Sequence, residues 1–233
     1  MSVSNQVYYR IKVIGLCLLL VYGFIGLVYY QFEMNINEQI FVTWLETVSD
    51  SLTFSVIGLP LSYLVVLSFT IKEKSSIVII RQQTRIRLFG RDTYDLLKLT
   101  IIFVVFSYFP ILVINYLKGQ PVIDVAFWVH LTAMSLFLVV MGVVMQLSQL
   151  IFKQKIVAIV VMISIIFCNY FTYMNPSFFL HDYLPINYMI LSSSNYSTSL
   201  FQFTIASLLY FIGLISCIEV LVYVGYQKVR LGR

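Results

Sequence analysis

Charged side chains are scarce in this sequence of 233 residues, since only 11% of them are Asp, Glu, Lys or Arg. A typical soluble domain carries about 25%. Hydrophobic residues make up 60% of the chain, and the mean hydropathy is +0.92. So few charges cannot cover the surface of a soluble protein, so lipid must be the solvent for most of the chain. This excludes a soluble enzyme, a disordered protein and a nucleic-acid-binding domain, despite an isoelectric point near 9.0.

Cysteine and the familiar catalytic motifs are also missing or rare. The three cysteines (Cys17, Cys168 and Cys217) lie in apolar runs without a CxxC pair, which argues against a disulfide framework or a zinc site. The sequence has no GxxxxGK[ST] phosphate loop, no HExxH and no GxSxG motif. His130 and His181 are far apart, and a lone imidazole such as His130 is more typical of helix packing than of a metal ligand. We therefore expect neither an enzyme nor a cofactor bound by this chain.

What the sequence has instead is a series of long apolar runs. Each is about as long as the 20 residues that a helix needs to cross a bilayer. The runs predict an all-α, polytopic integral membrane protein that forms a single transmembrane domain over residues 1–233. The six predicted spans are approximately 13–32, 52–71, 99–117, 125–151, 156–174 and 200–226.

The distribution of basic residues predicts the orientation of these spans. With six spans, 14 of the 15 Lys and Arg residues fall on one side, and only Lys118 falls on the other. Six of the ten acidic residues lie on the side of Lys118. The positive-inside rule then places both termini in the cytoplasm. We therefore expect a multi-pass membrane protein.

The connection 72–98, between the second and third predicted spans, is the one substantial basic segment. Its arginines recur at helical spacing, followed by the apolar pair Leu88 and Phe89 and then Gly90, which we expect to end a short helix. Such a segment is compatible with a basic loop held only by anionic lipid and the membrane potential. An exposed apolar pair favours a second interpretation, in which an amphipathic coupling-type helix contacts a cytoplasmic partner. Asp92 and Asp95 are expected near the N-terminus of the next helix.

Glu219 is a carboxylate within the sixth predicted span. A charge at membrane depth is costly, which makes it a candidate functional residue by default. It would either pair with Lys228 or with a basic residue of a neighbouring helix, or take part in the coupling of transport.

The last outer connection, 175–199, is rich in aromatic residues and poor in charge. It contains Phe178, Phe179, Tyr183 and Tyr188, and two prolines divide it into short pieces. This composition predicts a re-entrant or interfacial segment at the outer face of the membrane, since aromatic side chains favour that interface.

The layout of these elements resembles the membrane subunit of type-two ATP-binding-cassette exporters. In that family six spans carry a coupling helix between the second and third spans and short re-entrant helices before the last. The stretch Ile77-Val-Ile-Ile-Arg81, with Arg85 and Arg87-Leu-Phe after it, is similar to one in small permeases of Gram-positive bacteria. Those permeases belong to bacteriocin, lantibiotic or toxic-peptide export and immunity systems.

The resemblance implies a permease subunit that exports an amphipathic or hydrophobic peptide, or a lipid-like molecule. It would pair with a second permease subunit, identical or related, and with a separate cytoplasmic ATPase that binds ATP and Mg. The residues then expected to contact the ATPase are Arg81, Arg85, Arg87, Leu88 and Phe89. Two alternatives stay open: a non-transporting immunity or sensor protein that binds a peptide, and a proton-coupled carrier that uses Glu219.

Overall fold

The computed structural model describes residues 15, 23, 56–70, 85–117, 125–175, 177, 183–188 and 200–228. Nearly all of these residues are helical, and no strand occurs among them. The all-α class predicted from the apolar runs is therefore confirmed. The first predicted span, 13–32, lies outside the described residues except for Gly15 and Gly23.

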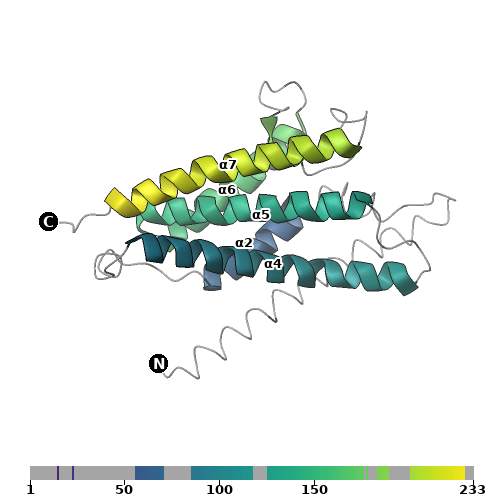
Figure 1. Cartoon of the computed structure of the whole chain (residues 1–233), viewed down its shortest axis with the longest axis horizontal. Helices are drawn as coiled ribbons and strands as arrows, with labels where there is room; N and C mark the ends of the chain where they lie inside the picture. The colour runs from purple at the N-terminus through teal and green to yellow at the C-terminus, as the bar shows by residue number, and fades with distance from the viewer. Residues whose placement is uncertain are drawn as a thin grey trace.

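The described helices lie side by side with their long axes roughly aligned (Figure 1). They are α2 (Leu59–Thr70), α4 (Arg85–Leu117), α5 (Val125–Phe152), α6 (Lys155–Tyr173), the short 3-10 helix η4 (Pro185–Tyr188) and α7 (Leu200–Lys228). Three segments are long and apolar enough to cross a membrane: Phe127–Phe152, Lys155–Thr172 and Thr204–Gln227. The arrangement of six spans with cytoplasmic termini stays a prediction.

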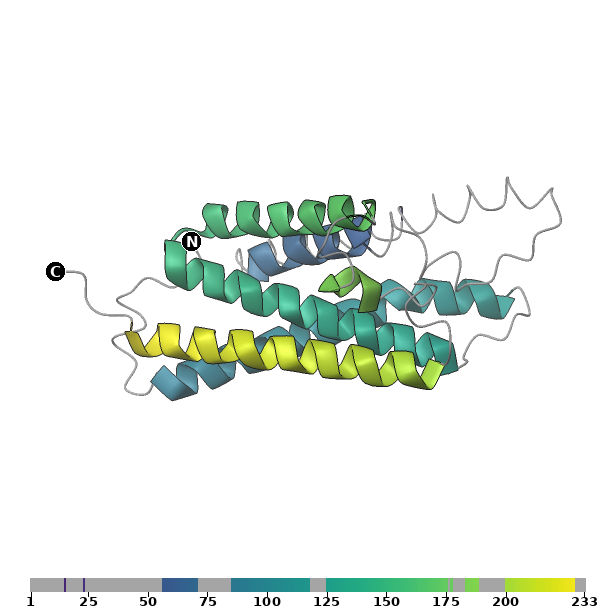
Figure 2. The ribbon, with the colours of Figure 1, turned by 90° about the horizontal axis from the view of Figure 1, so that it is seen from above.

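Helix α5 occupies the centre of the bundle. Viewed from above, α5 runs between α6 and α2 on one side and α7 on the other, and α4 crosses it at an angle (Figure 2). Two thirds of its apolar segment (67%) is buried, against 22% for α6 and 17% for α7. The other helices therefore expose apolar faces, as helices solvated by lipid do.

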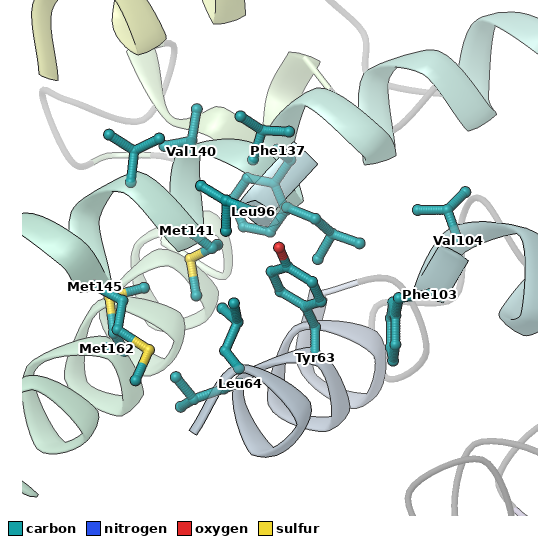
Figure 3. Close-up of a cluster of buried hydrophobic side chains, with 14 of the residues drawn as sticks. Tyr63, Leu64, Leu96, Phe103, Val104, Phe137, Val140, Met141, Met145 and Met162 are labelled. Carbon is teal, nitrogen blue, oxygen red and sulfur yellow. The ribbon is translucent and has the colours of Figure 1, made fainter. Parts of the chain in front are cut away.

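The core around α5 is lined by aliphatic and methionine side chains, with few polar atoms. Met134, Leu138 and Met145 of α5 are fully buried, and Met162 of α6 belongs to the same cluster, beside Met145 (Figure 3). Figure 3 shows Tyr63 of α2 reaching into this cluster beside Leu96 and Phe103. The flexible methionines fill the irregular spaces between helices that cross at different angles.

A tight turn joins α5 to α6 and places two lysines at one end of the bundle. Lys153 has a φ of 57°, and its N–H donates to the carbonyl of Gln149 at 2.9 Å, which ends α5. Gln154 is extended, and α6 begins at Lys155. The beginning of α4 and the end of α7 lie at this same end (Figure 1), which we call the basic end.

Helices α4 and α5 approach closely where Gly142 faces Leu96. A Cβ atom added at Gly142 would overlap the end of the Leu96 side chain, which is itself only 2% exposed. One turn further along α4, the hydroxyl of Tyr63 lies 2.6 Å from that of Thr100. Because Thr100 donates its own proton to the carbonyl of Leu96, Tyr63 is the donor to Thr100. These contacts fix the position of α4 against both α5 and α2.

Gly142→Ala is expected to destabilise the folded bundle by about 1–3 kcal/mol, because the buried Leu96 side chain must be displaced. Thermal unfolding of the purified protein in detergent measures the effect. Gly213→Ala is the matched control, since nothing lies within 4 Å of a Cβ there and alanine favours a helix over glycine. Adding Leu96→Ala should reduce the cost of Gly142→Ala. Equal stability of the two glycine variants would contradict the close packing.

Candidate functional site

The basic end of α4 differs from the short, separate coupling helix expected from the sequence. Helix α4 begins at Arg85 and continues without interruption through Gly90 to Leu117. The prediction that Gly90 ends a helix is therefore wrong. A glycine costs a helix about 1 kcal/mol relative to alanine, and the burial of Leu88 and Leu96 on either side outweighs that cost. Asp92 and Asp95 consequently lie beyond the first turn of α4, which holds no acidic residue.

The apolar pair Leu88 and Phe89 is packed inside the bundle. Leu88 is 2% exposed, and Phe89 packs against the core from its edge. The Phe89 ring makes edge contacts with Tyr223 and Tyr226 of α7, with centroids 5.6 and 6.0 Å apart. The expectation that these two side chains are exposed to a cytoplasmic partner is therefore wrong, because Leu88 is buried in the core and α7 covers part of Phe89.

The structure describes the three arginines of the predicted ATPase contact to different extents. Arg87 is exposed on α4. Arg85 is the first residue of α4, and its side chain lies outside the described part. Arg81 lies outside the described residues altogether. Of the five residues expected to contact an ATPase, Arg87 is thus exposed, Leu88 is buried and Phe89 is half-buried.

A polar contact that the sequence did not reveal joins α4 to α7 beside this aromatic group. The hydroxyl of Tyr226 donates to Oδ2 of Asp92 at 2.6 Å. On the other side, Nε2 of Gln146 in α5 donates to the carbonyl oxygen of Asp92 at 3.3 Å. Gln146 is 5% exposed, and its Oε1 has no hydrogen-bond partner in the described part of the chain. Three helices therefore meet at Asp92.

Glu219 takes part in a second contact between the same two helices. The hydroxyl of Thr93 donates to its carboxylate, at 3.3 Å from Oε1 and 3.5 Å from Oε2. The partner of Glu219 in the described part of the chain is thus a threonine hydroxyl, and its expected pairing with Lys228 stays a prediction, because that side chain lies outside the described part. We call the contacts of Asp92 with Tyr226 and of Thr93 with Glu219 the α4–α7 seam.

The seam also shows how deep Glu219 lies. Thr93 belongs to the charged part of α4, five residues before Lys98, a distance of roughly 7–8 Å along a helix. Glu219 is level with Thr93 and is partly exposed. Its carboxylate is therefore in the same layer as the charges of α4, rather than isolated among apolar side chains.

The opposite end of the bundle holds the described part of the predicted outer segment. Tyr188 of η4 stacks on Tyr210 of α7, with ring centroids 4.0 Å apart and an interplanar angle of 5°. Ser207 donates to the carbonyl of Tyr188 at 2.9 Å, and Tyr210 donates to the carbonyl of Tyr183 at 2.9 Å. These contacts fix η4 to α7. Phe178 and Phe179 lie outside the described residues.

Histidine 130 lies in the core between α4 and α5. It is fully buried, and its Nε2 is 2.8 Å from the hydroxyl of Tyr108, which is also buried. Among the residues that the structure describes, no group of three or more His, Cys, Asp and Glu side chains could hold a metal ion. His130 is thus packed in the core and hydrogen-bonded to Tyr108.

Tyr226→Phe is expected to weaken the α4–α7 seam, because it removes the donor to Asp92 while keeping the ring that packs on Phe89. A hydrogen bond between membrane helices contributes roughly 0.5–1.5 kcal/mol, and we expect a loss of stability of that size in detergent. Tyr223→Phe is the matched control, since Tyr223 also packs on Phe89 and is exposed. If both variants unfold at the temperature of the unaltered protein, the seam contributes no stability.

Comparison of this chain with protein-family models, with curated proteins and with solved structures finds no match. Any functional conclusion therefore depends on the composition of the chain and on the geometry described above.

Proposed function

We propose that this chain is the permease subunit of an ATP-binding-cassette exporter, with a separate cytoplasmic ATPase as its source of energy. The sequence supports this because it has no phosphate-binding loop and leaves little mass outside its apolar runs. A second permease subunit, identical or related, would complete the transporter. ATP and Mg would bind to the partner rather than to this chain.

The observation that carries the proposal is the continuity of α4. Its charged first part, 85–98, extends for roughly 20 Å at the basic end and leads directly into the apolar part of the same helix. Arg87, Arg91 and Asp95 are exposed along it. A force applied to this part by an ATPase would be transmitted by a single rigid helix to Leu96 and Thr100 in the core.

The contacts of α4 indicate what such a movement would change. At the basic end α4 is held to α7 by the seam, and in the core it packs on Gly142 of α5 and bonds Tyr63 of α2. Moving α4 would therefore alter its spacing from three helices at once. This arrangement suits a subunit that alternates between inward-open and outward-open states.

The proposed cargo is an amphipathic or hydrophobic peptide, or a lipid-like molecule. The core of the bundle is built from Leu, Val, Phe, Tyr and Met side chains and has few charged groups. A pathway opened between such helices would present apolar surface to its cargo, which favours apolar over strongly charged molecules. Bacterial peptide-export systems, such as those for bacteriocins, are the setting that fits this chemistry.

Reversing the charge of Arg85 and Arg87 to Glu is expected to reduce the ATPase recovered with this chain by roughly tenfold or more, because both arginines lie at the aqueous end of α4. The tagged protein is purified from its host membranes in mild detergent, and the ATP hydrolysis that accompanies it is measured. The matched control is the Lys153→Glu and Lys155→Glu pair, which makes the same charge change at the α5–α6 turn.

Undiminished recovery of the ATPase with the arginine variant would count against a contact at α4. Absence of any accompanying ATPase, combined with full protection of cells against the peptide, would instead favour an immunity or sensor protein. Unfolding temperatures of both variants show whether a loss of the ATPase reflects contact or misfolding.

A further inference from the structure

One face of α4 stays exposed along almost the whole helix. It begins at the basic end with Arg91, Tyr94 and Lys98, which follow one another at spacings of three and four residues and so share one side of the helix. The same side continues into the apolar part of α4. Its exposed residues there are Ile101, Val105, Phe109 and Tyr116.

Two tyrosines on this face, Tyr94 and Tyr116, are separated along the helix by about the thickness of a bilayer's hydrocarbon core. Tyr94 is 65% exposed and Tyr116 is 76% exposed. They are 22 positions apart (116 − 94), which is roughly 33 Å along an α-helix. The hydrocarbon core of a membrane is about 30 Å thick, and tyrosine is enriched at both of its borders. Tyr94 therefore falls at the headgroup level of the basic end.

The two cations flank Tyr94 at that level. Side chains on a helix lean toward its N-terminus, which for α4 is the basic end. Lys98 therefore extends from the edge of the apolar part back toward Tyr94. A long lysine side chain can in this way keep its charged end at the membrane interface. Arg91 lies beyond Tyr94 on the aqueous side.

The nearby acids leave this face positively charged. Asp92 is turned toward α7, where its carboxylate accepts the hydroxyl of Tyr226. Asp95 is exposed at the edge of the face, one turn from both Arg91 and Lys98. This face thus carries two cations, Arg91 and Lys98, and one acid, Asp95. Apolar side chains follow them along α4 on the same face. A phospholipid matches both parts of this face, since its phosphate complements the cations and its acyl chains complement the apolar side chains.

We propose that Arg91, Tyr94 and Lys98 form a binding site for the phosphate headgroup of an anionic phospholipid on the exposed face of α4. The acyl chains lie along Ile101 and Val105, on the membrane side of the cations. None of its three residues is among the five expected from the sequence to contact an ATPase, although they belong to the same charged part of α4, and the site does not depend on the proposed transport function. It gives α4 a fixed depth in the membrane.

Native mass spectrometry of the full chain in detergent tests the site. The protein is titrated with phosphatidylglycerol and, separately, with phosphatidylcholine, and the bound lipids are counted. We expect a clear preference for phosphatidylglycerol, and a reduction of its affinity of roughly tenfold or more in Arg91→Gln with Lys98→Gln. The matched control, Lys153→Gln with Lys155→Gln, removes the same charge at the same end and should keep the preference.

Three results would overturn the proposal. The first is equal binding of the two lipids by the unaltered chain. The second is an equal loss in the α4 variant and in the lysine control, which would indicate general surface charge. The third is equally strong binding of glycerol phosphate, which has no acyl chains and would indicate a site for free phosphate.

Discussion

Polar side chains inside an apolar bundle need partners on neighbouring helices, and in the described part of this chain α4 supplies many of them. Asp92 accepts from Tyr226 of α7, Thr100 accepts from Tyr63 of α2, and Tyr108 bonds His130 of α5. Each contact fixes α4 in a different direction. Apolar packing alone is weakly directional in lipid, so these contacts specify where α4 lies and how it is rotated.

The close approach of α4 to α5 adds a steric constraint to these bonds. Because Gly142 has no side chain, the end of the Leu96 side chain occupies the space that a Cβ atom at position 142 would fill. Because Leu96 is followed one turn later by Thr100, the packing contact and the hydrogen bond to Tyr63 position the same short stretch of helix. A displacement of α4 at its basic end would therefore disturb the centre of the bundle.

The α4–α7 seam changes the interpretation of Glu219 as an isolated charge. In the sequence, this carboxylate stands among apolar residues and looks like an isolated charge at membrane depth. In the structure, it lies beside Thr93, at the level of Arg91, Asp92 and Asp95. A carboxylate in a polar layer needs no transport role to explain it. The proton-coupled alternative accordingly loses its main physical argument.

The aqueous part of α4 was the least predictable region. The sequence predicted a separate helix that ends at Gly90, because glycine is a frequent helix breaker and Leu88 and Phe89 had no visible partner. The aromatic partners of Phe89 are Tyr223 and Tyr226, which are more than 130 positions away, and no local pattern connects them. The contacts of Asp92 with Tyr226 and Gln146 were missed for the same reason, since a hydrogen bond between distant helices leaves no periodic signal.

The sequence by itself determined the helical class and the apolar character of the bundle, because each apolar run carries its own requirement to be helical in lipid. The sequence also shows that the basic residues are concentrated in a few short segments between and beside the apolar runs. Only the tertiary structure decided which residues of the basic segment are available to a partner. Burial is a property of the helices that pack together, so Leu88 is buried in the core and Phe89 packs on α7, while Arg87, Arg91 and Tyr94 stay exposed.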